Sequence, residues 1–209
     1  MVGQGVLREC LLAEDFELVQ TVGRTATGAQ SPKLRELVQA DLFDIAAMED
    51  RLSGFDACFF CLGVTSAGMT EEAYTRVTFE LTTRIAAALS RLNPAMTFIY
   101  VSGSGTNSKG RSMWARVKGR TEDALLRLPF RSAYMFRPGF IEPLHGIQSK
   151  TRSYRIFYAV LRPLFTLLHR AFPNQVLTTE EVGLAMLLAV RIGAPKAVLE
   201  ARDIRALLG

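Results

Sequence analysis

Apolar positions along this chain follow two alternating spacings, and the alternation predicts an α/β fold. Nearly continuous apolar runs, typical of parallel strands buried on both faces, occur at Ala57–Leu62, Thr97–Val101 and Ala133–Phe136. Two further runs, Glu17–Val22 and Val38–Ala40, also fit strands. Apolar residues between the runs recur at helical spacing. We therefore expect a doubly wound, mostly parallel, Rossmann-like sheet with helices on both faces.

Three helical patterns stand out between and after these runs. Apolar residues recur at helical spacing over Ala73–Leu92 and again over Met113–Leu128. Near the end of the chain, Thr178 and Glu181 form a capping-box pattern, which opens a helix that should end near Gly193.

Length and composition indicate one globular domain. The chain has 209 residues, enough for a substantial core, and 49% of them are hydrophobic. We predict a single domain, 1–209, in which residues 140–177 form a small lid on the substrate side. The most apolar stretch, Ile156–Phe172, is too short and too charged to span a bilayer, and no segment has the order of a secretory signal. The cytosol is therefore the expected compartment.

The N-terminus departs from the usual order of a dinucleotide-binding fold, which opens with a strand, a glycine-rich turn and a helix. Here helical spacing begins at once, over Val2–Leu11, and Gly3 fits the third glycine of the turn. The absent strand would lie between the strands that end at Gly23 and Gly63, so two inner edges would be unpaired. We expect an N-terminally truncated sheet, explained either by a start site assigned too late or by a true truncation that binds cofactor poorly.

Residues 97–119 carry the strongest functional signal. The run Thr97–Val101 ends at Ser102, and the helical segment that follows places Trp114 and Lys118 four residues apart on one face. Strand, Ser, aromatic residue and Lys in this order resemble the active site of the short-chain dehydrogenase/reductase superfamily, in which the aromatic residue is a Tyr.

The resemblance implies that Ser102 polarises a substrate carbonyl and that Lys118 binds the nicotinamide ribose. Trp114 can orient a substrate, but an indole N–H is only a hydrogen-bond donor and cannot deliver a proton. Any reduction would then need water or substrate as the proton donor, and losing a positioned acid costs about 10²–10⁴-fold in rate. Alternatively, Ser102 is a turn serine, with Ser104 in reserve, and Trp114 is a core residue.

Other strand ends fit the remaining parts of a dinucleotide. Arg24 stands where an Arg accommodates the 2′-phosphate of NADP, and no acidic residue follows closely, which favours NADP over NAD. By resemblance, Asp41 contacts the adenine amine, and Gly63 lets backbone approach the cofactor. Pro138 and Gly139, within an Arg-Pro-Gly turn, resemble the segment against the nicotinamide. Alternatively, Arg24 is a surface residue, Asp41 caps a turn, and Arg137 is structural.

Together these positions resemble an atypical short-chain dehydrogenase/reductase, most similar to the oxidoreductase-like branch that includes Tat-interacting protein. The resemblance implies an NAD(P)-binding protein of the oxidoreductase or epimerase-like type that acts on a small carbonyl or hydroxyl compound. The alternative is a non-catalytic NADP sensor that docks a protein partner. The positions that carry the resemblance are Gly3, Arg24, Asp41, Gly63, Ser102, Lys118 and Arg137-Pro138-Gly139.

Cysteine spacing and charge bear on partners. Cys58 and Cys61 are spaced like a redox or zinc motif, but residues three apart on a strand face opposite sides, so we expect buried structural cysteines and no metal site.

The segment Lys109–Arg170 carries a net charge of +10 and the remainder −5. This asymmetry fits an anionic partner or a solvated basic surface. Residues 150–172 could form a lid, contact an acidic membrane or pack as a terminal subdomain. Without a recognition motif, we do not expect nucleic-acid binding.

Overall fold

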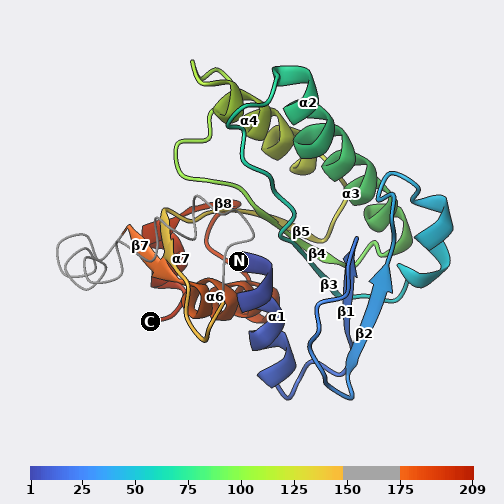
Figure 1. Ribbon diagram of the computed structural model, residues 1–209. Coiled ribbons are helices and arrows are strands. Elements are labelled where there is room, and N and C mark those ends of the chain that lie inside the picture. Colours follow the sequence, from blue (N-terminus) through green and yellow to red (C-terminus); the bar gives the residue numbers. More distant parts are fainter. Residues whose placement is uncertain (148–174) are drawn as a thin grey trace.

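The computed structural model describes residues 1–147 and 175–209, in which helices and strands alternate along the chain (Figure 1). The first half contains α1 (Val2–Leu12), β1 (Val19–Gly23), β2 (Leu34–Val38), a 3-10 helix (Ala46–Arg51), β3 (Ala57–Phe60), α2 (Glu71–Thr75), a π-helical turn (Arg76–Glu80) and α3 (Leu81–Leu92). The second half contains β4 (Thr97–Val101), α4 (Met113–Leu125), β5 (Ser132–Arg137), β6 (Phe140–Glu142), β7 (Val176–Thr178), α6 (Thr179–Ile192), β8 (Val198–Glu200) and α7 (Ala201–Ala206).

Every strand pair in the described residues is parallel, which confirms the predicted α/β class. The main sheet has the order β3-β4-β5-β8, and the pairs β1-β2 and β6-β7 form two smaller sheets. In the main sheet, Ile99 lies between Phe59 and Tyr134. Parallel pairing places the carboxyl ends of these strands at one edge, where open α/β sheets bind ligands.

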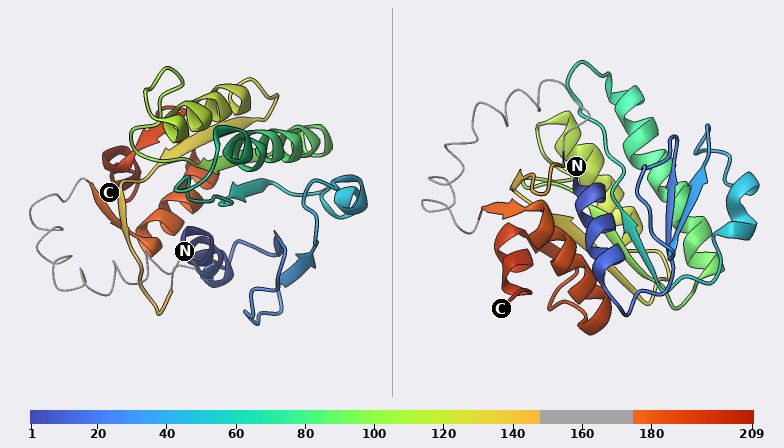
Figure 2. Two further views of the ribbon diagram at one scale, coloured as in Figure 1. Left: turned by 45° about the horizontal axis from the view of Figure 1, so that its top comes forward. Right: turned by 60° about the horizontal axis from the view of Figure 1, so that its bottom comes forward.

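The sheet is interrupted between β1 and β3. Among the described residues, β1 pairs with β2 alone and β3 with β4 alone, and Figures 1 and 2 show β1 and β2 on the β3 side of the main sheet. Phe16, in the connection before β1, stacks on Phe59 of β3 with ring centroids 6.3 Å apart, so a side-chain contact links this connection to the main sheet. The break falls where the sequence analysis placed the absent strand, and Val22 beside it is 42% exposed.

Helices cover both faces of the main sheet and enclose two cores (Figure 2). Helices α2, α3 and α4 lie on one face, and α1, α6 and α7 lie on the other (Figure 1). On β4, Phe98 belongs to the first core and Ile99 to the second, as strand alternation requires. Cys58 packs against the first core and Cys61 against the second, which confirms that the two thiols face opposite sides; both are free.

Close helix packing on the second face depends on glycine. A Cβ on Gly5 would lie 2.6 Å from the Thr179 carbonyl oxygen, so α1 approaches α6 through a position without a side chain. The predicted capping box is confirmed, because Thr178 Oγ1 accepts from the Glu181 N–H at 3.0 Å and Glu181 Oε2 accepts from the Thr178 N–H at 2.7 Å. Helix α6 ends at Gly193, also as predicted, with φ of 80°.

Element boundaries differ from the predictions where polar residues interrupt the pattern. The second strand is Leu34–Val38, so the prediction of Val38–Ala40 was wrong; only Leu37 of this strand is buried, and the pattern on this edge strand is weak. Helix α4 ends at Leu125, before the predicted Leu128. Among the described helices, none combines the length and apolar character needed to cross a bilayer.

Candidate functional site

Most candidate residues meet at the carboxyl edge of the strands. Each follows a strand directly or within a few residues, and since the strands are parallel, the fold brings these positions to one edge. They are Arg24 after β1, Asp41 after β2, Gly63 after β3, Ser102 after β4 and Pro138 with Gly139 after β5.

The β1–β2 side of this edge carries the exposed cation Arg24 and two acids, Glu36 and Asp41. Arg24 is exposed and forms no ion pair with any residue that the structure describes. Glu36 Oε1 accepts the Thr27 N–H at 2.6 Å, and hydrogen bonds from Thr27 lower the pKa of this carboxyl. The pairing of β1 with β2 brings Glu36 to the loop after Arg24. The sequence spacing of the two residues did not predict this contact. Asp41 Oδ1 accepts the Phe43 N–H at 2.9 Å, so it caps its own turn in this structure.

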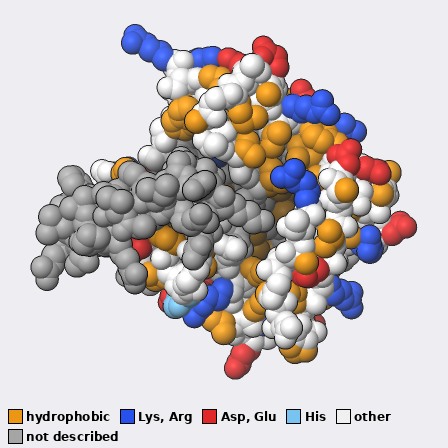
Figure 3. Space-filling view, viewed as in Figure 1, with side chains coloured by type: hydrophobic (Ala, Val, Ile, Leu, Met, Phe, Trp, Pro, Cys, Tyr) orange, Lys and Arg blue, Asp and Glu red, His pale blue; other side chains and the backbone are white. Residues whose placement is uncertain are grey.

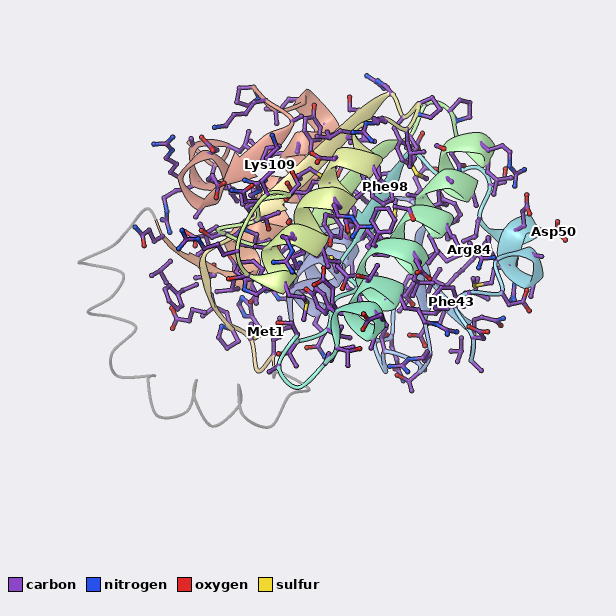
Figure 4. All side chains as sticks on the ribbon, turned by 90° about the horizontal axis from the view of Figure 1, so that it is seen from above. Met1, Phe43, Asp50, Arg84, Phe98 and Lys109 are labelled. Atoms are coloured by element: carbon purple, nitrogen blue, oxygen red, sulfur yellow. The ribbon has the colours of Figure 1, made fainter. Side chains whose placement is uncertain are left out.

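Two guanidinium groups hold Phe43, the residue that follows this turn. Arg76 lies 5.2 Å and Arg84 5.8 Å from the ring centroid, and Figure 4 shows the labelled Phe43 and Arg84 next to one another. Cation–π contacts of this kind are worth about 0.5–1 kcal/mol at exposed sites. They attach the loop after β2 to the π-helical turn and to α3, although none of the three residues belongs to a motif of the sequence.

Ser102 is buried and already hydrogen-bonded. Its Oγ lies 3.1 Å from Thr106 Oγ1, and the Thr106 hydroxyl in turn donates to the Gly103 carbonyl at 2.7 Å. Thr106 has one proton, so Ser102 is the donor in the contact between the two hydroxyls. A substrate carbonyl would have to take the place of Thr106 to accept this proton.

Lys118 projects from α4 to the end of β4. Its ammonium donates to the Val101 carbonyl at 3.3 Å and lies 5.3 Å from the centroid of the Tyr100 ring. Burial lowers the pKa of Lys118 to about 8, and the nearby Glu122 offsets part of this effect. A partly buried ammonium with one carbonyl partner costs stability, and perturbed groups of this kind cluster at functional sites.

Replacing Lys118 with Met should stabilise the fold at neutral pH by about 1–2 kcal/mol. Below pH 8 the lysine is charged in both states, so the whole penalty is present. Between pH 8 and 10.5 the folded state has lost this proton and the unfolded state keeps it, so wild-type stability rises and the advantage of Met shrinks. Urea unfolding at pH 7 and pH 10 measures this. Exposed Lys109→Met is the control, and an advantage independent of pH would contradict the expectation.

The Arg-Pro-Gly turn is held by structural contacts. Arg137 Nε donates to Glu122 Oε1 at 2.9 Å, a second nitrogen donates to Glu122 Oε2, and a third reaches Glu200 Oε1 at 3.0 Å. A Cβ on Gly139 would lie 2.5 Å from the Gln175 carbonyl oxygen, so this glycine permits the approach of another backbone segment. The Pro138 carbonyl accepts the Ser104 N–H at 3.4 Å and joins the turn to the serine loop.

A hollow of about 240 Å³ lies beside Trp114. Its other lining residues are Val64, Thr65 and Ser66, which follow Gly63, and Tyr74 from α2. The hollow is therefore at the carboxyl edge, next to the proposed cofactor positions. A second hollow of about 340 Å³, lined by residues 53–56 and 92–95, lies at the opposite edge, where β3 and β4 begin. Tyr74 gave no signal in the sequence because it lies 40 residues before Trp114 and outside any motif.

The start of α1 also lies at this edge. A Cβ on Gly3 would be 3.1 Å from Cys61 Cβ, so helix and strand end are in close contact, as expected for the third glycine of the turn. Burial raises the pKa of the Cys61 thiol to about 12, and the amino group of Met1 is near enough to lower it in part. The N-terminus of a helix, with its free N–H groups, favours anions.

Sequence comparison finds fungal relatives but no matching protein-family model. Protein FMP52-2, mitochondrial, of Scheffersomyces stipitis is 28% identical over 155 residues, and the match covers 73% of this chain and 66% of that protein. Protein fmp52-2, mitochondrial, of Aspergillus oryzae is 29% identical over 144 residues, covering 67% of this chain and 62% of that protein. The chain thus spans slightly less than two thirds of these relatives. The expected cytosolic compartment is contradicted, because these relatives are named as mitochondrial proteins.

Solved structures share the fold over nearly the whole chain. The Bordetella bronchiseptica enzyme WbmG, in complex with NAD, superposes with a TM-score of 0.69 at 11% identity, covering 96% of this chain and 68% of WbmG. UDP-N-acetylglucosamine 4-epimerase from Methanobrevibacter ruminantium gives a TM-score of 0.68 at 15% identity, covering 96% and 72%. These likenesses confirm the Rossmann fold that the resemblance to short-chain dehydrogenases/reductases implied.

Proposed function

From this Rossmann fold, we propose that the protein binds NADP across the carboxyl ends of its strands and is an oxidoreductase or epimerase-like enzyme for a small carbonyl or hydroxyl compound. The observation that carries the proposal is Lys118, whose ammonium lies at the end of β4, where it donates to the Val101 carbonyl. The nicotinamide complex of a neighbour such as WbmG supports the class of cofactor.

The residues at the edge fit a dinucleotide at both ends. Apart from its chain neighbours, none of the described residues comes within 4 Å of a Cβ built on Gly63, so its backbone is open to a ligand. Arg24 is free of ion pairs among the described residues, and the start of α1 offers N–H groups for a pyrophosphate. The described residues do not include the first two glycines of the turn that would complete the pyrophosphate site.

Four of the candidate residues then have a defined task. Arg24 would pair with the 2′-phosphate, Asp41 would meet the adenine, and Lys118 would donate to the nicotinamide ribose. Ser102 would polarise the substrate carbonyl after releasing Thr106. A bound nicotinamide dinucleotide supplies a hydride donor or acceptor, while the protein holds the substrate in the hollow beside Trp114. The names of the fungal relatives support a mitochondrial location for this protein too.

We expect slow NADPH consumption with small aldehydes or ketones, followed by absorbance at 340 nm. Ser102→Ala and Lys118→Ala should each lower kcat/KM at least about 10²-fold, because misplaced reactants lose rate on that scale. Lys109→Ala, an exposed lysine in the loop after β4, is the matched control and should retain the wild-type rate. A protein that binds NADPH and reduces no compound of the panel would contradict the enzymatic proposal.

A non-catalytic NADP sensor is the second candidate. Two observations favour it. Trp114 stands where the short-chain dehydrogenases/reductases have their acid, a Tyr, and the Ser102 hydroxyl already donates a hydrogen bond to Thr106. Under this alternative, NADP purified with the protein stays unchanged after incubation with substrates, and only the loaded protein docks its partner.

The possible membrane segment, 150–172, lies outside the described residues. On the face in Figure 3, basic and acidic side chains are interspersed.

A further inference from the structure

We infer that Tyr74 supplies the proton-donating phenol that position 114 lacks, from the wall of the hollow it shares with Trp114. The inference rests on the proposed function and names the acid for the same site. Tyr74 lies in α2 and Trp114 in α4, and both line the hollow of about 240 Å³. The remaining lining residues, Val64, Thr65 and Ser66, are not types that ordinarily act as general acids, whereas tyrosine is.

A local irregularity of the helix adjoins Tyr74. The π-helical turn Arg76–Glu80 begins two residues after it and separates α2 from α3. This turn packs on α4, where the Thr121 hydroxyl donates to the Val117 carbonyl at 2.8 Å and approaches the Thr78 carbonyl at 3.4 Å. Single π-helical turns inside α-helices occur frequently at functional sites, because they redirect the neighbouring side chains.

Tyr74 is almost completely buried where it lines the hollow, so the hollow is the route by which a ligand would reach its hydroxyl. The residue is 2% exposed, and its polar neighbours among the described residues include the hydroxyl of Thr78 and the phenol of Tyr100, whose pKa Tyr74 helps to raise. Among the residues that the structure describes, Thr78 Oγ1 is buried and has no hydrogen-bond partner of normal geometry, so the two hydroxyls are close but poorly aligned. Burial raises the pKa of Tyr74 more than Thr78 lowers it, so the phenol carries its proton at neutral pH.

The chemistry balances with the nicotinamide dinucleotide as reductant. As the carbonyl carbon gains a hydride, its oxygen takes the proton of Tyr74 Oη. The phenol O–H bond breaks, the O–H bond of the product alcohol forms, and water returns a proton to the phenolate. Trp114 covers the substrate in this arrangement and Lys118 keeps its ribose contact. In this arrangement the proton donor lies on α2 and not on α4, whereas Lys118 remains on α4.

Tyr74→Phe tests the inference, with Tyr134→Phe as the matched loss of a phenol far from the hollow, where Tyr134 Oη accepts the Ala194 N–H. We expect Tyr74→Phe to bind NADPH as wild type does in calorimetry, and to lower kcat for a small aldehyde at least about 10²-fold. Adding Trp114→Tyr to Tyr74→Phe should restore most of the rate, since that phenol lies four residues before Lys118. A Tyr74→Phe protein with wild-type kcat, or no recovery in the double variant, overturns the inference and leaves NADP binding intact.

Binding to the hollow gives a readout that needs no cofactor. Trp114 is the one tryptophan in the 209 residues, so its fluorescence reports directly on the hollow. Aldehydes should quench it in wild type and in Tyr134→Phe, and should bind about tenfold more weakly in Tyr74→Phe, which lacks the hydrogen-bond donor. Equal aldehyde affinities of wild type and Tyr74→Phe would overturn the inference. This readout does not need NADPH to bind, so it tests the inference even where the proposed function has failed.

Discussion

Arg137→Met should lower the free energy of unfolding by about 3–5 kcal/mol at neutral pH, because it leaves the carboxylate of Glu122 buried without its ion-pair partner. The Glu122 side chain is 4% exposed and accepts two hydrogen bonds from the guanidinium. This pair joins α4, which carries Trp114 and Lys118, to the end of β5. Urea unfolding at pH 7, followed by circular dichroism, measures the loss.

Arg191→Met is the matched control for this substitution. Arg191 also makes two hydrogen bonds to one carboxylate, but Asp15 is 54% exposed, and exposed pairs are worth about 0–1 kcal/mol. A loss at Arg191 equal to that at Arg137 would show that burial of the acid is not the cause. Adding Glu122→Gln to Arg137→Met should recover part of the loss, since the uncompensated charge is then gone.

Gly119→Ala should destabilise the protein by about 3 kcal/mol or more and weaken dinucleotide binding. A Cβ at this position would lie 2.2 Å from the Ser108 backbone nitrogen and 2.6 Å from Ser108 Cα, so the backbone itself must move. Gly119 follows Lys118, and the displaced loop connects Ser102 to α4. Thermal unfolding and NADPH calorimetry on the same sample separate the two effects.

Gly103→Ala is the control in the same loop. In the part of the chain that the structure describes, nothing but the chain neighbours comes within 4 Å of a Cβ built on Gly103, so the extra methyl group has room. We expect this variant to unfold within about 0.5–1 kcal/mol of wild type. A tolerated Gly119→Ala would mean that the loop does not pack on α4 as described here.

Local patterns were sufficient for much of the fold. The run Thr97–Val101 predicted β4 without error, and the Thr178 capping box and Gly193 predicted both ends of α6. The interruption between β1 and β3 also followed from chain order alone. Patterns failed for β2, where polar residues interrupt the strand, and for the three-residue strands β6, β7 and β8, which are too short for any period to be visible.

The site was less predictable because tertiary contacts define it. Chain order placed Arg24, Gly63, Ser102 and Lys118 at one edge, but their roles at the site remain predictions. Neither the Thr106 contact of Ser102 nor the bonds from Arg137 to Glu122 and Glu200 could be read from spacing. Tyr74 shares no motif with Trp114, and a wall built from α2 and α4 exists only once the two helices pack together.

Calorimetric titration of the wild-type protein and of Arg24→Ala with NADPH and NADH tests most directly whether a dinucleotide lies across the strand ends. We predict that wild type binds NADPH about tenfold to a hundredfold more tightly than NADH, as expected for charge-assisted hydrogen bonds to one phosphate, and that Arg24→Ala removes the difference. No binding of either dinucleotide by the wild-type protein, or a preference that survives in Arg24→Ala, would contradict this.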